Sequence, residues 1–327
     1  HSHAAEPDWI ELYNTTGRPI NIGGWFLSDS DVDDPNRKKY EIADDTVIDP
    51  NGYVVFYEDQ HFGNIADTGC HTPFALSENG ETLYLRSGQN GILTGYYDDE
   101  TFDASETNVA FGRYYKESTD TYNFVAMSKN TPGAANAYPK VGPIVISEIM
   151  YHPRDPNLGS PYTDDDDFEY VELQNITASP VTLQEYDDEL QIDVGWRFTD
   201  EDESIDFVFP LSTTIPPGGY LLLVKDEDAF NYRYTAPGGV QLLEWGDGKC
   251  NNGGEKIELQ MPGDMVDSER YYIRIDRVNY SDGSHPEGED TWPPEPDGTG
   301  QSLTRKVATD YGNDVVNWQA AKPTPGQ

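Results

Sequence analysis

Acidic loops are the part of this sequence whose residue types and spacing could do chemistry, and that chemistry would be calcium binding. In the stretch 29–34, carboxylates stand at alternate positions, Asp29, Asp31 and Asp33, as they do in calcium-binding loops. The stretch lacks the glycine and the distal bidentate glutamate that complete an EF-hand, so it is not one. With oxygens from a neighbouring loop it would offer a full coordination shell; otherwise it is a solvated acidic loop.

A loop of the same character follows later in the sequence, at 200–203, with Asp200 and Asp202 as candidate metal ligands. The stretch 164–167 is a bare run of aspartates. Runs of like charge usually stay solvated, so the same two interpretations apply to each loop. Calcium is the one cofactor that the sequence suggests.

Catalytic motifs are missing from the sequence. With 60 acidic residues, pairs of carboxylates are abundant and are no sign of glycoside hydrolysis. Glu11 and Glu172 recur in one strand pattern, and we predict that each accepts hydrogen bonds from a neighbouring turn. The histidines form no close ligand pair apart from His1 and His3, and no nucleophile elbow, phosphate loop or dinucleotide fingerprint is present. We therefore predict that the protein is not an enzyme.

The charge balance narrows the partners and the location. The 327 residues carry 60 acidic and 21 basic side chains, a formal net charge of −39. Nucleic acids and anionic membrane surfaces require the opposite sign, so both are disfavoured. Carboxylates on this scale repel one another unless salt or divalent cations screen them, which favours an extracellular or cell-surface protein. The alternative is that the acid only keeps the surface soluble.

Membrane insertion and thiol chemistry are also disfavoured. No stretch of 18 apolar residues exists, so we expect no membrane-spanning helix. Cys70 and Cys250 do not fall at matching positions, and a disulfide would need their Cα atoms about 6 Å apart. Two independent buried thiols are the favoured interpretation, with a disulfide as the alternative.

The chain is internally duplicated. The block 8–14 (Asp-Trp-Ile-Glu-Leu-Tyr-Asn) returns as 169–175 (Glu-Tyr-Val-Glu-Leu-Gln-Asn), a pattern typical of a half-buried strand that ends in a tight corner. Further motifs recur in the same order, at 24–29 and 195–200, 47–53 and 214–220, 79–85 and 253–259, and 131–133 and 324–326.

The duplication predicts an all-β protein of two tandem antiparallel β-sandwiches. Short strands alternate with Gly, Pro, Asn and Asp turns, and only 226–232 offers a turn or two of helix. We place the domains at 1–137 and 143–327, joined by a short linker that two prolines stiffen.

The two halves differ at their start. The second opens with a strong strand, 144–150, ahead of its repeated block, whereas the first has only 1–5 in that place. A sandwich without its first strand leaves a neighbouring edge unpaired. Either the sequence was cut there, or another subunit or an upstream segment donates the strand.

The ordered set of motifs, found twice, resembles lamin-tail domains, and Ile146–Pro153 resembles the opening of bacterial, secreted or surface members of that family. The resemblance implies one immunoglobulin-like β-sandwich per copy and no catalytic activity. It also implies that such domains accompany large secreted or surface proteins and often lie beside extracellular enzymes or adhesive modules. The second copy departs from the pattern by an insertion around 185–194 and by a run of acidic residues at 164–167, just before its repeated block.

These observations favour a non-catalytic extracellular protein for surface structure, adhesion or assembly, with other subunits or domains of a larger extracellular protein as partners. The alternative is a calcium-dependent carbohydrate-binding region of a secreted enzyme, with a polysaccharide as partner. A third hypothesis is a polymer subunit that uses a donated strand. Trp25 and Trp196 are expected in the core, whereas a sugar-binding face would draw on Trp245, Trp292, Tyr271 and Tyr272.

Overall fold

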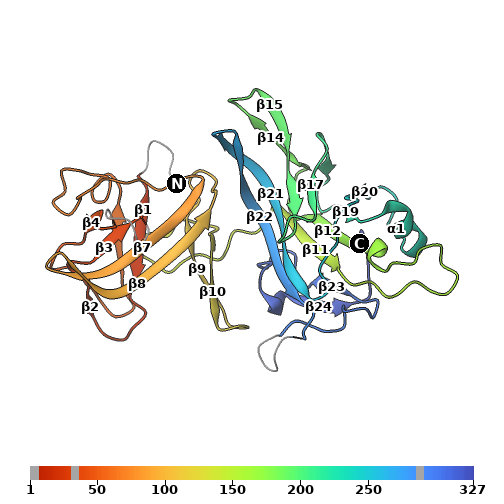
Figure 1. Cartoon of the computed structure of the whole chain (residues 1–327), viewed down its shortest axis with the longest axis horizontal. Coiled ribbons are helices and arrows are strands. Elements are labelled where there is room, and N and C mark those ends of the chain that lie inside the picture. Colours follow the sequence, from red (N-terminus) through yellow and green to blue (C-terminus); the bar gives the residue numbers. More distant parts are fainter. Residues whose placement is uncertain (1–6, 31–36, 285–290) are drawn as a thin grey trace. The chain divides into compact units, whose positions relative to one another are not determined.

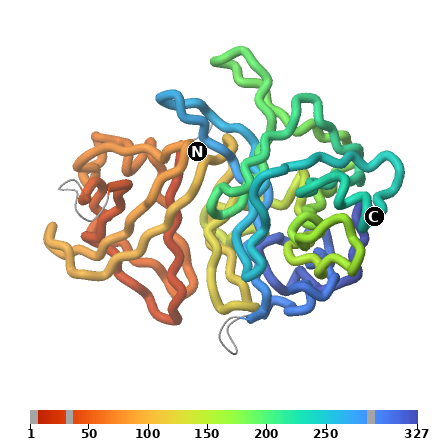
Figure 2. The backbone as a smooth tube through the Cα atoms, turned by 45° about the vertical axis from the view of Figure 1, so that its right-hand side comes forward, coloured from red at the N-terminus to blue at the C-terminus, as the bar shows by residue number. Residues whose placement is uncertain are grey.

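The computed structural model describes residues 7–30, 37–284 and 291–327, which are almost entirely strands and turns. The chain divides into two compact units: unit 1 comprises 1–114 and 122–140, and unit 2 comprises 115–121 and 141–327. Figure 2 shows the backbone course, with unit 1 mainly from red to yellow and unit 2 mainly from yellow-green to blue. In the described ranges no helix is long and apolar enough to cross a membrane.

Unit 2 contains a six-stranded sheet in which β11 is a central strand (Figure 1). Neighbours pair antiparallel except β19 and β20, which are parallel and are connected through α1. In sheet order the strands are β20 (Gln241–Glu244), β19 (Tyr220–Val224), β12 (Tyr170–Asn175), β11 (Ile144–Met150), β23 (Ser302–Arg305) and β24 (Trp318–Ala321).

The second sheet of unit 2 has four strands and includes a long hairpin. Its order is β17 (Asp206–Val208), β16 (Arg197–Thr199), β21 (Gly254–Val266) and β22 (Glu269–Ser281). The smaller pairs are β13 (Val181–Thr182) with β18 (Thr214–Ile215), and β14 (Gln184–Asp187) with β15 (Ile192–Gly195). The predicted insertion at 185–194 thus forms most of the β14–β15 hairpin.

The main core of unit 2 draws on both sheets, including Ile146 and Leu173 from one and Phe198 and Leu259 from the other. A smaller cluster packs Phe230 of α1 (Glu227–Arg233) with Tyr170, Leu222 and Val224. All seven residues of β11 are buried, because it is a central strand with both faces covered. Two short 3₁₀ turns, η1 (Asp166–Phe168) and η2 (Val315–Asn317), complete the unit.

Unit 1 has an equivalent four-stranded sheet. Its order is β4 (Tyr40–Glu41), β3 (Phe26–Ser28), β7 (Gly80–Gln89) and β8 (Ile92–Asp103). Leu27 of β3 faces Leu85 of β7, just as Phe198 of β16 faces Leu259 of β21. The register therefore confirms that the repeated motifs occupy the same places in the two units.

The other layer of unit 1 is divided into separate pairs. These are β1 (Trp9–Tyr13) with β6 (Tyr53–Tyr57), β9 (Phe111–Lys116) with β10 (Thr121–Ala126), and β2 (Ile20–Asn21) with β5 (Val47–Ile48). By the repeat, β1 and β6 correspond to β12 and β19, and β9 and β10 correspond to β23 and β24. Within the described residues of unit 1, no strand stands at the place of β11 between β1 and β9.

The architecture confirms the all-β prediction, with α1 close to the helical turn expected at 226–232. Cys70 and Cys250 are both buried and free, as expected of independent thiols. Trp196 is 2% exposed and lies in the core as predicted. Trp25 is only partly buried against the core of unit 1.

Candidate functional site

The predicted calcium loop of unit 1 is only partly described. Asp31 and Asp33 lie outside the described residues. Asp29 forms an ion pair with Lys39, and both side chains are largely buried. The positive charge beside Asp29 is thus supplied by the protein itself.

In the corresponding loop of unit 2, one candidate ligand is buried and the other is exposed. Asp200 is 2% exposed; its Oδ2 accepts a hydrogen bond from Ser204 Oγ at 2.5 Å, and its Oδ1 is buried and has no hydrogen-bond partner among the described residues. Asp202 is exposed and accepts from the Ser204 backbone N–H at 3.0 Å. One of the two predicted ligands therefore has a buried oxygen to spare, and the other remains at the surface.

The aspartate run brings the ligand oxygens of Asp164, Asp165 and Asp166 within 4.8 Å of one another. Asp166 is paired with Lys249 at 2.5 Å, and Asp165 lies 3.3 Å from His152. Because neighbouring basic side chains partner two of its members, this run carries no metal-site argument.

The predicted ligand Asp200 belongs to a buried acid cluster of unit 2 whose other two members were not predicted. It consists of Glu169, Asp200 and Glu255, which pack around the buried Cys250. The Cys250 backbone N–H donates to Glu169 Oε2 at 3.0 Å, and Tyr280 Oη donates to Glu255 Oε1 at 3.0 Å. Within the described parts of the chain, Glu169 Oε1, like Asp200 Oδ1, is buried without a hydrogen-bond partner.

The repeat places Asp8, Asp29 and Glu81 at the equivalent positions of unit 1. The match extends to single hydrogen bonds: the Ser77 N–H donates to Glu81 Oε1 at 2.6 Å, and the Asn251 N–H donates to Glu255 Oε1 at 2.8 Å. The alignment of the two copies pairs these acids position by position, but the sequence does not show that burial brings them together.

The two acid sets differ in how their charge is balanced. In unit 1 burial raises the pKa of Glu81, and the Lys39 ammonium acts against that rise. In unit 2 burial raises the pKa of Glu255 to about 7 and that of Glu169 well above its usual value. The positive charge of Lys225 acts against this rise in the pKa of Glu169. Its ammonium, however, donates hydrogen bonds to the backbone carbonyls of Gly246 and Gly248. The acid cluster of unit 2 is therefore short of positive charge.

Glu11 and Glu172, the glutamates that recur in the two copies, each accept a hydrogen bond from a turn of their own unit. The Gly133 N–H donates to Glu11 Oε2, and the Gly326 N–H donates to Glu172 Oε2, each at 2.5 Å. Ser147 Oγ of β11 donates to the other oxygen of Glu172 at 2.6 Å. Burial raises the pKa of Glu172 to about 7 although these donors oppose the shift. The predicted structural role is confirmed.

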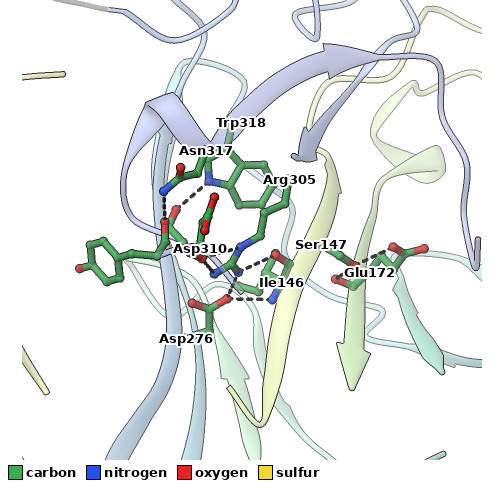
Figure 3. Close-up of polar contacts among 10 residues, drawn as sticks. Ile146, Ser147, Glu172, Asp276, Arg305, Asp310, Asn317 and Trp318 are labelled. Carbon is green, nitrogen blue, oxygen red and sulfur yellow. Dashed lines mark hydrogen bonds and ion pairs between the residues drawn. The ribbon is translucent and has the colours of Figure 1, made fainter. Parts of the chain in front are cut away.

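A buried ion pair forms hydrogen bonds with the backbone of β11 (Figure 3). Arg305 Nη1 donates to Asp276 Oδ2 at 2.6 Å and to the Ile146 carbonyl at 3.0 Å, while the Ile146 N–H donates to Asp276 Oδ2 at 2.9 Å. The Arg305 side chain is 1% exposed. We call Arg305 and Asp276 the clamp of unit 2.

Unit 1 contains an equivalent ion pair, and among its described residues no strand lies beside the pair in the place of β11. Arg113 and Asp98, the equivalents of Arg305 and Asp276, pair at 2.9 Å, and Arg113 also pairs with Glu100. The Arg113 side chain is 41% exposed. Its guanidinium is thus partly open to solvent where Arg305 is covered.

A cavity of about 990 Å³ lies beside this pair, and we call it the slot. It is lined by all of β1 on one side and by residues 108–113 on the other, with Trp25, Leu83 and Leu85 among its apolar lining. In the equivalent place unit 2 carries β11.

The family model of the lamin tail domain matches residues 1–98 and 138–274. The chain belongs to the lamin tail domain family. Since one matched segment falls in each unit, the protein is a tandem of lamin tail domains, and each unit is an immunoglobulin-like sandwich. No curated protein and no solved structure matches the chain.

Membership of a non-catalytic domain family agrees with the predicted lack of enzymatic motifs. The aromatic residues considered for sugar binding lie mostly against the protein. Trp245 and Trp292 of the second lamin tail domain pack on its core. Tyr271 and Tyr272 are partly buried on β22, and Arg197 lies over the Tyr272 ring.

Proposed function

We propose that this tandem of lamin tail domains is a non-catalytic structural protein of the cell surface or extracellular space. Its role is adhesion or assembly with other subunits or domains of a larger extracellular protein. The net charge of −39 supports surroundings rich in salt or divalent cations.

The observation that carries the structural role is the use of the recurrent polar groups of the two units. Glu11, Glu172 and the pair of Arg305 with Asp276 bind turns and strands of their own units. Perturbed carboxyl groups in a cleft are candidates for catalysis, but these are occupied by backbone donors and neighbouring side chains. Polar groups that bind the backbone in this way favour one arrangement of the strands.

The localisation is tested on intact cells that produce the protein. Antibodies against the chain and an added protease should both reach it without lysis, and a cytoplasmic marker protein in the same sample should stay protected. Protection of the chain until the cells are lysed would contradict the extracellular role.

A calcium ion at the acid cluster of unit 2 is a second candidate function. Two partnerless oxygens, Glu169 Oε1 and Asp200 Oδ1, favour it, as does Lys39 beside the equivalent acids of unit 1. Hard cations such as Ca²⁺ take carboxylate oxygens. The cluster does not bring three ligand oxygens within 4.8 Å, among the described residues, so its side chains must turn toward the ion. Calorimetric titration of the chelator-treated protein with Ca²⁺ tests it; an absence of heat would contradict it.

No packing observation favours the carbohydrate-binding alternative, because Trp245 and Trp292 lie against the core. A glycan array in the presence of Ca²⁺ is the direct test. We expect no specific signal, and a specific glycan bound at micromolar concentration would replace the structural proposal.

A further inference from the structure

The acid set of unit 1 contains a cation of its own, the Lys39 ammonium. Lys39 Nζ forms an ion pair with Asp29 Oδ1, and the two side chains are only 16% and 17% exposed. The same ammonium lies over the Phe74 ring, 5.7 Å from the ring centre. The face of an aromatic ring attracts a positive charge, so this contact helps to hold the ammonium in place. Lys39 is therefore anchored beside the acids of unit 1.

Lys39 also acts on Glu81, the acid on the neighbouring strand β7. Burial is the main cause that raises the pKa of Glu81, and the charges of Asp29 and Asp8 add to the rise. The Ser77 N–H and the Lys39 ammonium act in the opposite direction. One ammonium thus contacts Asp29 directly and lies within electrostatic reach of Glu81.

The strand register places Asp206 where unit 1 has Lys39. Equivalent residues of β3 and β16 face Tyr40 of β4 and Phe207 of β17. The residue just before this aromatic residue is Lys39 in unit 1 and Asp206 in unit 2. Asp206 is exposed and accepts a hydrogen bond from Arg197 Nε at 2.6 Å. It brings no positive charge to the acid cluster of unit 2.

Two basic side chains of unit 2 that could balance the acid cluster are bound elsewhere. Arg197, on β16, pairs with both Asp206 and Glu203. Lys225 acts on Glu169, but its ammonium donates to two backbone carbonyls. Unit 2 therefore has the equivalent acids without the cation that accompanies them in unit 1.

The acid cluster of unit 2 also has oxygen atoms to spare. Glu169 is fully buried and Asp200 is 2% exposed, yet one carboxylate oxygen of each has no hydrogen-bond partner among the described residues. A third such oxygen, Asn252 Oδ1, belongs to the turn between Cys250 and Glu255. A buried carboxylate without a partner is unfavourable, and carboxylate and amide oxygens are ligands that Ca²⁺ takes.

We propose that Lys39 is a built-in cation: in unit 1 its ammonium takes the place that a calcium ion takes in unit 2. Unit 1 is then complete without calcium, and only unit 2 needs the ion. Removal of calcium loosens the segments around Glu169, Asp200 and Glu255 and leaves unit 1 folded. The inference names how calcium regulates the tandem, and it rests on the calcium candidate of the proposed function.

The two cations differ in how they depend on the surroundings. An ion that binds only the folded state stabilises that state more as its concentration rises above the dissociation constant. An ammonium that belongs to the chain is present at every calcium concentration. Calcium should therefore change the stability of one domain and not of the other.

The first test uses the parent chain, treated with chelator and then titrated with Ca²⁺. Hydrogen exchange followed by mass spectrometry reports on each unit separately. At saturating Ca²⁺ we expect amides that flank Glu169, Asp200 and Glu255 to exchange at least tenfold more slowly. Amides that flank Asp29 and Glu81 should exchange as they do with chelator.

The second test transfers the calcium requirement to unit 1. In Lys39→Gln the carboxylates of Asp29 and Glu81 lose their cation, so unit 1 should need an added one. Titration calorimetry should find one calcium ion per parent chain and two per variant chain, and Ca²⁺ should now slow exchange in unit 1. Lys38→Gln is the matched control, because Lys38 Nζ donates to the Gly91 carbonyl at 2.8 Å and pairs with none of these acids. It should bind one ion, as should Lys39→Arg, which keeps the charge.

Three results would overturn the inference. They are calcium-dependent protection of unit 1 in the parent, a single bound ion in Lys39→Gln, and failure of Ca²⁺ to restore unit 1 of that variant. A parent chain that binds no calcium would remove the calcium candidate together with this inference. One ion in both the parent and Lys39→Gln would remove the inference alone. Neither result bears on exposure of the chain at the cell surface.

Discussion

Arg305 donates a hydrogen bond to the carbonyl of Ile146 across 159 residues of sequence, and the same nitrogen donates to the carboxylate of Asp276. The ion pair thus holds a main-chain group of the central strand rather than another side chain. Its counterpart in unit 1, Arg113 with Asp98, has formed beside an open slot. The difference between the two ion pairs therefore shows what contact with β11 adds in unit 2.

Arg305→Ala should destabilise unit 2 by about 3–5 kcal/mol, since it leaves Asp276 buried without its partner charge. Arg113→Ala should cost only about 0–1 kcal/mol, because that pair is partly open to solvent. Urea denaturation of both variants beside the parent chain gives the two free energies of unfolding. Equal costs would contradict the different coverage of the two pairs.

Trp196→Ala should cost about 3–5 kcal/mol of unfolding free energy, because the side chain is 2% exposed and its removal leaves a cavity. The matched change is Trp25→Ala at the equivalent position of unit 1. It should cost clearly less, since Trp25 is only partly buried beside the slot. Thermal unfolding of the two variants compares them, and a larger loss for Trp25→Ala would show that the slot is closed.

Unit 2 should lose stability as the pH rises from about 4.5 to about 7. Burial, opposed by Ser147 and Gly326, raises the pKa of Glu172 from 4.5 to about 7, so the folded state holds a proton that the unfolded state releases. The stabilising contribution is complete below pH 4.5 and is lost as the pH passes 7. Melting temperatures across this range, for the parent and for Glu172→Gln, should show a shallower slope in the variant. An unchanged slope would contradict the shift.

Calcium should raise the melting temperature of the parent chain and leave that of Asp200→Asn unchanged. Asn keeps the shape of Asp200 but removes the charge that the cation needs. The matched control is Asp202→Asn in the same loop, where the side chain is exposed and the calcium effect should persist. Scanning calorimetry with Ca²⁺ and with chelator measures both. If Asp202→Asn removed the effect instead, the ion would lie in the surface loop.

The all-β fold and the correspondence between strands of the two units were predictable because alternation and turn residues are local signals that appear twice. Leu27 and Phe198 could be paired in advance from their Gly-Trp motifs alone. The role of Glu11 and Glu172 was also visible, since an acid between apolar neighbours in a strand needs donors nearby. The match between Arg113 and Arg305 was visible as well, but not the acid that each would meet.

The acid cluster was not predictable, because burial decides which carboxylates interact. Glu169, Asp200 and Glu255 come from three separate segments, and the sequence shows equally acidic loops beside them. Asp202 and Asp200 look alike in sequence, yet one is exposed and the other is buried. Lys39 lies beside the acids of unit 1, and the acid cluster of unit 2 has no lysine in the equivalent place among the described residues. This difference shows only when the two units are compared in space.

The turn at 324–326 binds two glutamates of the central strands: the Thr324 N–H donates to Glu148, at 3.1 Å to its Oε1, and the Gly326 N–H donates to Glu172. During synthesis, β11 leaves the ribosome about 150 residues before β23 and about 175 residues before this turn. Until then one edge of β11 is unpaired, Glu148 has Tyr170 but lacks Ser302 and Thr324 as donors, and Glu172 has Ser147 but lacks Gly326. Contacts across such long loops close slowly, so unit 2 should complete its folding late and remain dependent on chaperones while it is made.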